Sequence, residues 1–310
     1  MDDSHHDALW REFPKTLPEF EKRFPDEESA RAYFALLRWN GRPSCARCAC
    51  TRVREIRTRA RYECADCRHQ TSLTSGTVLE GTRKPIKLWL RAAFEMSVRR
   101  TGISAKDLQR IMGFGSYETA WTWLHKIRHG LAREKRTALA GELQIDECFI
   151  GGKGSEKAMV FVAAELGRRI RMAHAPHKDE KTMKAFVDAH IAGSATITSD
   201  GLATYNAAVL GARVHEMVVQ TPQEREADDA LQSCHWATSL AKRWLMGTHH
   251  GAVRPKHLQA YLDEHVFRYN RRATKGVARI AARAIEGMAI SKPLTMRRLV
   301  DETKECRHFA

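Results

Sequence analysis

The stretch LQIDECFIGGK, residues 143–153, has the composition of a short β-strand that ends in a glycine turn. Apolar and polar residues alternate along it, and β-branched and aromatic side chains are frequent. Strand alternation places Ile145 and Glu147 on one face and Asp146 on the other. If Ile145 faces a core, Asp146 faces an open side, where a carboxylate is a natural ligand for a hard cation such as Mg²⁺. An ordinary edge-strand aspartate fits the same stretch, so the rest of the chain must decide.

The chain after residue 140 alternates between strand and helix patterns, which predicts an α/β domain. Strands are expected at residues 143–150, 158–164, 169–175, 195–201 and 214–219, the first three as an antiparallel meander. Helices are expected at residues 181–191, at about 230–245 and at 255–269. The fourth strand ends in Asp200-Gly201, which gives a second carboxylate at a strand end.

The positive charge of the chain is concentrated in one block. The 310 residues carry 52 basic and 37 acidic side chains, a net charge of +15, and residues 45–140 alone hold 20 basic and 8 acidic ones. Such a block attracts polyanions, nucleic acid above all, through counterion release. The absence of a membrane-spanning apolar run and of a signal-peptide pattern predicts a cytoplasmic protein with no membrane partner.

Four of the eight cysteines form two close pairs, Cys45-Ala-Arg-Cys48 and Cys64-Ala-Asp-Cys67, separated by fifteen residues. Two such knuckles at this separation match a tetrahedral zinc site, and the run between them can form a hairpin. A module with so little core does not fold without its metal. The alternative is a redox C-x-x-C motif, but its βαβ context is missing here. We therefore predict structural Zn²⁺ bound by Cys45, Cys48, Cys64 and Cys67.

Basic side chains and a two-helix motif in the same block are suited to DNA. The arginines of the hairpin predicted to contact phosphate are Arg52, Arg54, Arg59 and Arg61. A short helix after Ser104, a glycine-containing turn at residues 113–116 and a second helix from Tyr117 predict a helix-turn-helix. Lys126 and Arg128 on the second helix would then face a DNA groove. A plain three-helix packing unit has the same sequence pattern.

Further motifs extend from about residue 25 to residue 272. They are Leu37-Arg-Trp39, the cysteine ribbon with Thr71-Ser-Leu-Thr-Ser-Gly-Thr77, the helix of Trp89, Ile145-Asp-Glu147 with Ile150-Gly-Gly-Lys153, Ser199-Asp-Gly201 with Tyr205, residues 242–251 (KRWLMGTHHG), and residues 255–258 (PKHL) through 267–272 (FRYNRR). On these motifs the chain resembles bacterial insertion-sequence transposases of the DDE type. Within that group it resembles the subgroup with an N-terminal zinc ribbon and a compact RNase H-like (ISXO2-like) catalytic domain.

Together with the patterns above, the resemblance implies an α/β fold class with five segments. These are a helical lead-in (1–44), a Cys₄ zinc ribbon (45–80), a helix-turn-helix DNA-binding domain (81–140), an RNase H-like mixed-sheet domain with flanking helices (141–272) and a basic C-terminal tail (273–310) with a weak helical pattern at its start. The implied partners are double-stranded DNA, as terminal inverted repeats and target DNA, and further copies of the chain in a homodimer or larger synaptic complex. The implied location is the bacterial cytoplasm, at the nucleoid when the protein is bound to DNA.

The resemblance also implies a mechanism in which carboxylates hold two Mg²⁺ or Mn²⁺ ions about 3.5–4 Å apart and a phosphodiester is cut and rejoined in line. Asp146 and Asp200 match the first two family carboxylates and are the predicted metal ligands. Alternation points Glu147 away from Asp146, so Glu147 is not expected to bind the metal. Lys242 is predicted to contact phosphate near the scissile bond, and Arg243 is predicted to contact DNA.

The third metal-binding position departs from the family pattern. In residues 235–242 (HWATSLAK), the match of the flanking residues places Leu240, which cannot bind a metal, at the ligand position. His235 matches a family histidine and is a candidate catalytic residue, but it lies about 140° around a helix from Leu240 and does not simply substitute for a ligand there. Asp228 or Asp229 could supply the third metal ligand instead. Catalysis is then either impaired, or two aspartates suffice together with water and substrate phosphates.

Three functions follow from these patterns. The first is a transposase whose ribbon and helix-turn-helix bind the element ends while the α/β domain performs strand chemistry. The second is a catalytically inactive, transposase-derived DNA-binding protein, which the basic block and Leu240 support. The third, a zinc-ribbon RNA-binding protein, lacks the aromatic stacking pattern that such proteins use.

Overall fold

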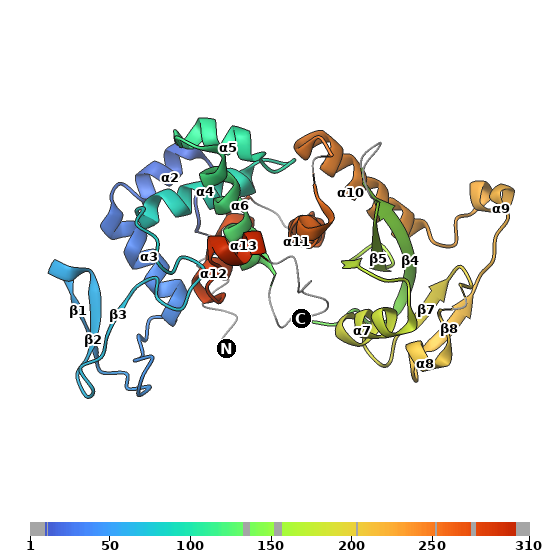
Figure 1. Cartoon of the computed structure of the whole chain (residues 1–310), viewed down its shortest axis with the longest axis horizontal. Helices are drawn as coiled ribbons and strands as arrows, with labels where there is room; N and C mark the ends of the chain where they lie inside the picture. Colours follow the sequence, from blue (N-terminus) through green and yellow to red (C-terminus); the bar gives the residue numbers. More distant parts are fainter. Residues whose placement is uncertain are drawn as a thin grey trace. The chain divides into compact units, whose positions relative to one another are not determined.

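The computed structural model describes residue 10 and residues 12–132, 137–151, 157–202, 204–251, 253–273 and 277–301 (Figure 1). The chain forms two compact units, one of residues 1–133 with 274–300 and the other of residues 134–273 with 301–310. Along the described parts of the chain, no helix has both the length and the apolar character needed to cross a membrane. The chain therefore leaves the first unit, builds the second, and returns to the first.

The first unit is mainly helical. Its helices are α2 (Leu17–Arg23), α3 (Glu27–Trp39), α4 (Ile86–Val98), α5 (Ala105–Met112), α6 (Tyr117–Leu131), α12 (Val277–Ile290) and α13 (Met296–Asp301). The Glu27 carboxylate accepts hydrogen bonds from the backbone N–H groups of Ile86 (2.7 Å) and Lys87 (2.9 Å) and so caps α4. The indole rings of Trp89 and Trp123 stack 3.6 Å apart, which joins α4 to α6. The predicted pair of helices around residues 113–116 is confirmed as α5 and α6.

Helix α12 corrects the prediction of a C-terminal tail from residue 273. It packs against α3, α4 and α6, and its Ala281, Ile285 and Met288 side chains are fully buried. The helical pattern of this segment is weak in the sequence because most of its buried apolar residues are alanines, which add little to a hydrophobic stripe. In the structure these small side chains allow a close approach of α12 to its neighbours.

The zinc-ribbon segment forms a small antiparallel sheet in the order β1 (Val53–Ile56), β2 (Arg61–Cys64), β3 (Gln70–Ser72). The single 3₁₀ turn η1 (Arg57–Arg59) lies at the tip of the hairpin between β1 and β2. Arg38 of α3 donates a hydrogen bond to the carbonyl of Ser72 (3.0 Å), and the rings of Trp39 and Tyr62 are in contact at 4.6 Å. The neighbouring residues Arg38 and Trp39 therefore join α3 to the ribbon.

The second unit is built on a mixed five-stranded sheet. Its strands are β4 (Glu142–Ile150), β5 (Ala158–Glu165), β6 (Ile170–Ala175), β7 (Thr196–Ser199) and β8 (Val214–Met217), in the spatial order β6-β5-β4-β7-β8. The first three form the predicted antiparallel meander, while β7 pairs in parallel with β4 and β8 with β7. This is the RNase H-like arrangement expected from the sequence. The predicted strands and helices of this unit are confirmed.

Helices cover both faces of this sheet. The helices of this unit are α7 (Glu180–His190), α8 (Ala207–Leu210), α9 (Pro222–Ala227), α10 (Gln232–His249) and α11 (Pro255–Tyr269). Leu143 and Ile145 belong to one apolar core, with residues of α7 and α8, whereas Cys148 and Ile150 belong to a second, with residues of α10 and α11. The expectation that Asp146 faces an open side was wrong, because α10 packs on β4 and leaves the Asp146 side chain 13% exposed.

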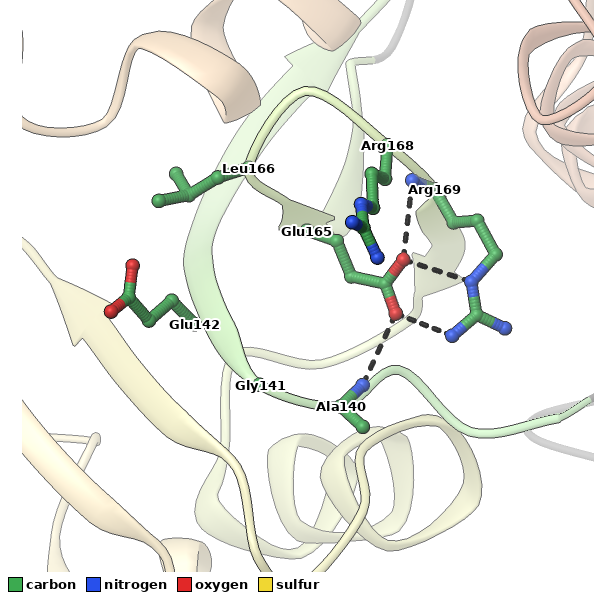
Figure 2. A pocket seen from close by; sticks show the side chains of 7 residues that line it. All are labelled: Ala140, Gly141, Glu142, Glu165, Leu166, Arg168 and Arg169. Atoms are coloured by element: carbon green, nitrogen blue, oxygen red, sulfur yellow. Dashed lines mark hydrogen bonds and ion pairs between the residues drawn. The ribbon is translucent and has the colours of Figure 1, made fainter.

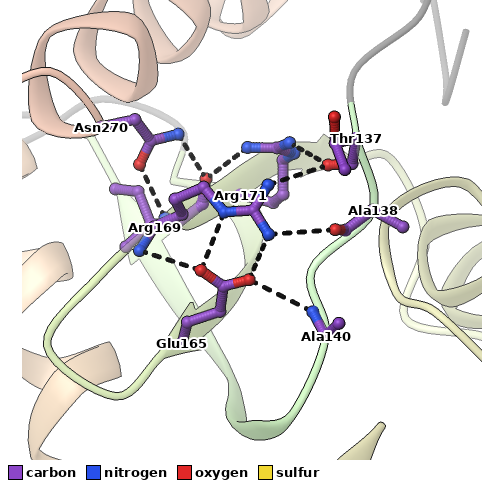
Figure 3. Close-up of polar contacts among 8 residues, drawn as sticks. Thr137, Ala138, Ala140, Glu165, Arg169, Arg171 and Asn270 are labelled. Carbon is purple, nitrogen blue, oxygen red and sulfur yellow. Dashed lines mark hydrogen bonds and ion pairs between the residues drawn. The ribbon is translucent and has the colours of Figure 1, made fainter. Parts of the chain in front are cut away.

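The β5–β6 hairpin anchors the two ends of the second unit (Figure 3). The Glu165 carboxylate pairs with Arg169, whose guanidinium also donates to the carbonyl of Ala138 (3.1 Å), just before β4. At the end of α11, the Asn270 side chain accepts a hydrogen bond from Ile170 N–H (2.7 Å) and donates to its carbonyl (3.0 Å). Asn270 thus satisfies both backbone groups of one residue on β6, the strand at one end of the described sheet.

Candidate functional site

The four paired cysteines converge on one point. The ligand atoms of Cys45, Cys48, Cys64 and Cys67 all lie within 4.8 Å of one another, and three of the sulfur–sulfur distances are 3.4, 3.5 and 3.6 Å. Four sulfurs placed about 2.3 Å from a tetrahedral zinc ion would stand about 3.8 Å apart, so the cluster has the donor set and dimensions of such a site. Among the described residues, no other group of three His, Cys, Asp or Glu side chains converges in this way.

Both knuckles have the same backbone path. The residue after each second cysteine, Ala49 or Arg68, has a left-handed backbone with φ of 58° and 57°. Its N–H returns to the carbonyl of the first cysteine, at 2.9 Å for Cys45 and 3.1 Å for Cys64. Backbone N–H groups, that of Cys67 above all, lower the pKa of Cys64 to about 6, which favours the thiolate form that binds metal.

The four ribbon arginines predicted to contact DNA are all exposed. Arg52 forms an ion pair with Asp66, and Arg54 pairs with Glu63 at 2.7 Å. Arg59 and Arg61 lie at the tip of the hairpin, in η1 and at the start of β2. The Arg52–Asp66 pair is exposed and therefore weak, whereas Glu63 is largely buried and also accepts a hydrogen bond from Gln70 (2.8 Å), so Arg54 is held more firmly.

The prediction that Lys126 and Arg128 face a DNA groove was wrong for Arg128 and is weakened for Lys126. Arg128 is 1% exposed, and Lys126 lies with its ammonium 5.8 Å from the Trp89 ring centre, where burial lowers the pKa of the lysine. Helix α12 packs against α6 around Gly130, so part of the α6 surface close to Arg128 is covered. Thr122, one turn earlier, contacts Met296 of α13 at 3.0 Å.

Asp146 and Asp200 lie at equivalent levels of neighbouring parallel strands. In the β4–β7 ladder, Gln144 is opposite Thr198, so each aspartate follows two residues after a paired position. Asp200 is the first residue after β7, so the strand register brings its backbone close to the level of Asp146 but does not fix the direction of its side chain. Burial raises the pKa of Asp146 to about 6, and the charges of Glu147 and Asp200 act in the same direction. A carboxylate with this pKa is poorly solvated and would gain from a bound cation.

Helix α10 is fixed to β4 by Gln144, a residue that the sequence analysis did not select. The Gln144 side chain donates to the carbonyl of Ala230 (2.8 Å) and accepts from the backbone N–H of Ser233 (2.7 Å), at the start of α10. Two residues further along each element, β4 carries Asp146 and α10 carries His235. The His235 Nε2 atom lies 3.5 Å from Asp146 Oδ2.

This contact bears on the third ligand position, for which the flanking residues indicate Leu240. The sheet-facing side of α10 is formed by Cys234, Ala237 and Ala241, which are fully buried. His235 and Leu240 lie on opposite edges of that face, because they are about 140° apart around the helix. Leu240 packs against the apolar core, whereas His235 faces Asp146. The angular separation that seemed to exclude His235 is the reason that it, and not Leu240, reaches the acidic site.

Lys242 lies on the same edge of α10 as His235, since seven residues correspond to nearly two complete helical turns. Both Lys242 and Arg243 are exposed. Burial raises the pKa of Cys148 to about 11, and the positive charge of Lys242 opposes this rise. The geometry therefore leaves Lys242 available beside the acidic site.

Glu147 points to the opposite face of the sheet, as alternation predicted. Its carboxylate accepts a hydrogen bond from the Tyr205 hydroxyl (2.8 Å) and pairs with Lys178 (3.0 Å). Tyr205 follows Asp200 by five residues, so this bond ties the segment after β7 to β4. Glu147 thus supports the position of Asp200 without joining it.

A cavity of about 580 Å³ lies elsewhere in the second unit (Figure 2). It is lined by Ala140, Gly141, Glu142, Glu165, Leu166, Arg168 and Arg169. Glu165, its best-buried acid, is already bonded to Arg169 and to the N–H of Ala140 (3.2 Å). None of the predicted site residues lines this cavity, so it belongs to the anchor of the hairpin.

Comparison with known families agrees with this geometry. The family model described as the ISXO2-like transposase domain matches residues 138–270, and the transposase zinc-ribbon domain matches residues 25–70. The first match contains Asp146, Asp200 and His235, and the second contains the four clustered cysteines. A comparison with curated proteins gave no match. The chain belongs to the ISXO2-like insertion-sequence transposases that carry a zinc ribbon.

Proposed function

We propose that this chain is an active DNA transposase, which binds insertion-sequence ends and catalyses divalent-metal-dependent cleavage and strand transfer. Its family membership supports a transposase function. The observation that carries the catalytic proposal is the contact between His235 and Asp146 beside the strand end that holds Asp200. With His235 in this place, Leu240 is no argument for impaired catalysis.

Two of the proposed ligands, Asp146 and His235, already stand at the spacing that one divalent cation requires, whereas the donor atoms of Asp146, Asp200 and His235 do not all lie within 4.8 Å of one another. Two atoms bound to one ion at about 2.1 Å stand about 3 to 4 Å apart, and His235 Nε2 and Asp146 Oδ2 are separated by 3.5 Å. Asp146, Asp200 and His235 would hold Mg²⁺ or Mn²⁺ in this proposal. When bound, the metal ions supply Lewis acidity and offset the negative charge that develops on the phosphoryl group.

The residues of the chain would orient an in-line displacement. A water oxygen forms a bond to phosphorus while the bond to the 3′-oxygen breaks and that oxygen leaves as a 3′-hydroxyl. The freed 3′-hydroxyl oxygen then bonds to a phosphorus of the target, loses its proton and displaces the 3′-oxygen of the target strand, which leaves as a new 3′-hydroxyl. Lys242 would donate to a non-bridging phosphate oxygen, since its ammonium is exposed beside the site. Arg243, the next residue of α10, would contact the DNA backbone close by.

DNA binding is proposed for the zinc-ribbon hairpin and the helix-turn-helix. Arg52, Arg54, Arg59 and Arg61 present four guanidinium groups on one exposed hairpin, a suitable arrangement for successive phosphates. A structural Zn²⁺ held by the four cysteines would keep this hairpin folded. The DNA substrates would be terminal inverted repeats and target DNA, and two or more copies of the chain would pair the element ends.

The test of catalysis uses the purified full-length protein and a labelled duplex that carries the terminal sequence flanking its gene. With Mg²⁺ or Mn²⁺ we expect nicking at the end and joined products. Asp146→Asn and Asp200→Asn should each abolish nicking with DNA affinity retained. Asp228→Asn removes the same charge at an exposed position and should keep activity. Binding by the wild type without nicking would instead support a catalytically inactive DNA-binding protein.

The zinc proposal has a separate test. Metal analysis should find about one Zn per chain, lost in Cys45→Ser/Cys64→Ser. Cys50 lies in the same segment but outside the cluster, so Cys50→Ser is the matched control and should retain the metal. A ribbon that folds with no bound metal would refute the proposal.

A further inference from the structure

His235 stands between two carboxylates. Its Nδ1 atom lies 2.6 Å from Asp229 Oδ2, and its Nε2 atom lies 3.5 Å from Asp146 Oδ2. The first distance is that of a short hydrogen bond, and the second matches two donor atoms that bind the same ion. The imidazole is therefore held at one nitrogen and directed at the acidic site with the other.

The chemistry of the groups decides where the ring proton lies. A carboxylate only accepts hydrogen bonds, so the bond to Asp229 requires the hydrogen on Nδ1. In the neutral ring, Nε2 then carries a lone pair that points toward Asp146. A metal-binding histidine needs this form, and a carboxylate on the far nitrogen is the usual device for fixing it.

Asp229 itself is held firmly in front of α10. Its second oxygen, Oδ1, accepts a hydrogen bond from Leu231 N–H (3.0 Å). The side chain of Gln220 bonds to the backbone on both sides of Asp229. It donates to the carbonyl of Asp228 (2.6 Å) and accepts from Ala230 N–H (3.0 Å). Both oxygens of Asp229 are therefore in use, and its Oδ2 is left to His235 alone among the bonds described for it.

We propose that Asp229 is a positioning residue that fixes the tautomer and direction of His235. It is not a metal ligand in place of Leu240, because the imidazole of His235 lies between it and Asp146. This inference rests on the proposed role of His235 at the metal site. It adds a residue that acts through hydrogen bonding and does not touch the DNA or the metal.

The test reads the tautomer directly. Full-length, metal-free protein with ¹⁵N-labelled histidine is examined by NMR, and His235→Gln assigns the ring signals. In the wild type we expect a protonated Nδ1 and an unprotonated Nε2. In Asp229→Asn the single carbonyl oxygen stays on Leu231 N–H, so the amide NH₂ faces Nδ1 and the hydrogen should move to Nε2. Asp229→Glu retains an acceptor and should restore the wild-type pattern at least in part.

Asp228→Asn is the matched control, since it makes the same change one residue earlier at an exposed side chain. It should leave the His235 signals as in the wild type. Mn²⁺ binding, measured by calorimetry without DNA, should weaken about 10- to 100-fold in Asp229→Asn and remain unchanged in the control.

The outcomes separate this inference from the catalytic proposal. An unchanged His235 tautomer in Asp229→Asn, or a wild type with the hydrogen on Nε2, would overturn the positioning role. If the tautomer moves as expected but wild-type protein never nicks its terminal duplex, the catalytic proposal fails and the role of Asp229 in orienting His235 stands.

Discussion

A Cβ atom on Gly287 would overlap the carbonyl oxygen of Gly130. The converse is also tight, since a Cβ on Gly130 would lie 2.8 Å from the backbone nitrogen of Met288. Helices α6 and α12 therefore touch backbone to backbone where these glycines meet. Such an approach needs glycine on both helices. The two glycines therefore determine where α12 crosses α6.

Gly287→Ala should destabilise the first unit by about 1 to 3 kcal/mol, because the added methyl group has no space unless α12 moves. The near-ultraviolet circular dichroism of the stacked Trp89 and Trp123 can follow thermal unfolding of this unit. Gly247→Ala on α10 is the control: nothing lies within 4 Å of its added Cβ, and alanine should stabilise that helix slightly. Equal unfolding temperatures for Gly287→Ala and the wild type would contradict the close crossing.

Removal of all residues after Ala273 should unfold or loosen the first unit, although the truncated chain keeps residues 1–133 and the α/β unit. Ile285 and Met288 are fully buried against that unit, and the truncation would expose the apolar surface that they cover. We expect loss of the Trp89–Trp123 signal and of DNA binding. A truncated chain that binds DNA with wild-type affinity would show that α12 is dispensable.

The metal preference of the reaction should reflect His235. Imidazole is a better ligand for Mn²⁺ than for Mg²⁺, which favours oxygen ligands, so we expect faster nicking with Mn²⁺ than with Mg²⁺. His235→Glu should shift the preference toward Mg²⁺. His235→Ala should lower nicking by about 100-fold or more with either ion, and Leu240→Ala should preserve it. A Leu240→Ala variant as inactive as His235→Ala would reverse the assignment of the site to His235.

Acid should destabilise the second unit through His265, which packs near the rings of Trp244 and Tyr269. Burial lowers the pKa of His265 to about 4. Below about pH 6.5 His265 is protonated in the unfolded chain, but in the folded chain it stays neutral down to about pH 4. The free energy of unfolding therefore falls as the pH falls toward 4. The loss is about 3 kcal/mol at most.

Urea unfolding between pH 4 and 7 tests this expectation. His265→Phe keeps a ring in the apolar site and removes the titration, so its stability should depend less on pH than that of the wild type. His250→Asn is the control, because it changes an exposed histidine in a left-handed position that asparagine tolerates. Its stability should depend on pH as that of the wild type does. Parallel pH profiles for wild type and His265→Phe would exclude His265 as the source.

The sequence predicted the elements of the second unit because their patterns are local. Alternation along residues 143–150 predicted β4, and it correctly sent Glu147 away from Asp146. The parallel pairing of β4 with β7 could not be read from either strand alone, since it depends on where α7 returns the chain. The placement of Asp200 beside Asp146 therefore came from the family resemblance and agrees with the strand register.

The errors arose where a side chain's surroundings depend on a distant segment. Arg128 was expected in a groove because α12 lies about 150 residues further along the chain and its alanine-rich face gave a weak signal. The flanking residues match Leu240 to the site, but a sequence match does not show which edge of α10 faces β4. The Gln144 contacts that fix this rotation are also long-range, so a single sequence offers no signal for them.

The return of α12 to the first unit has a consequence for the order of synthesis. A ribosome delivers the ribbon, helices α4 to α6 and the whole α/β unit before it delivers α12, the helix that completes the first unit. Until α12 emerges, the first unit lacks the helix that packs against α3, α4 and α6. A chain that stops before α12 would therefore lack part of the core of its first unit, whatever it had already folded.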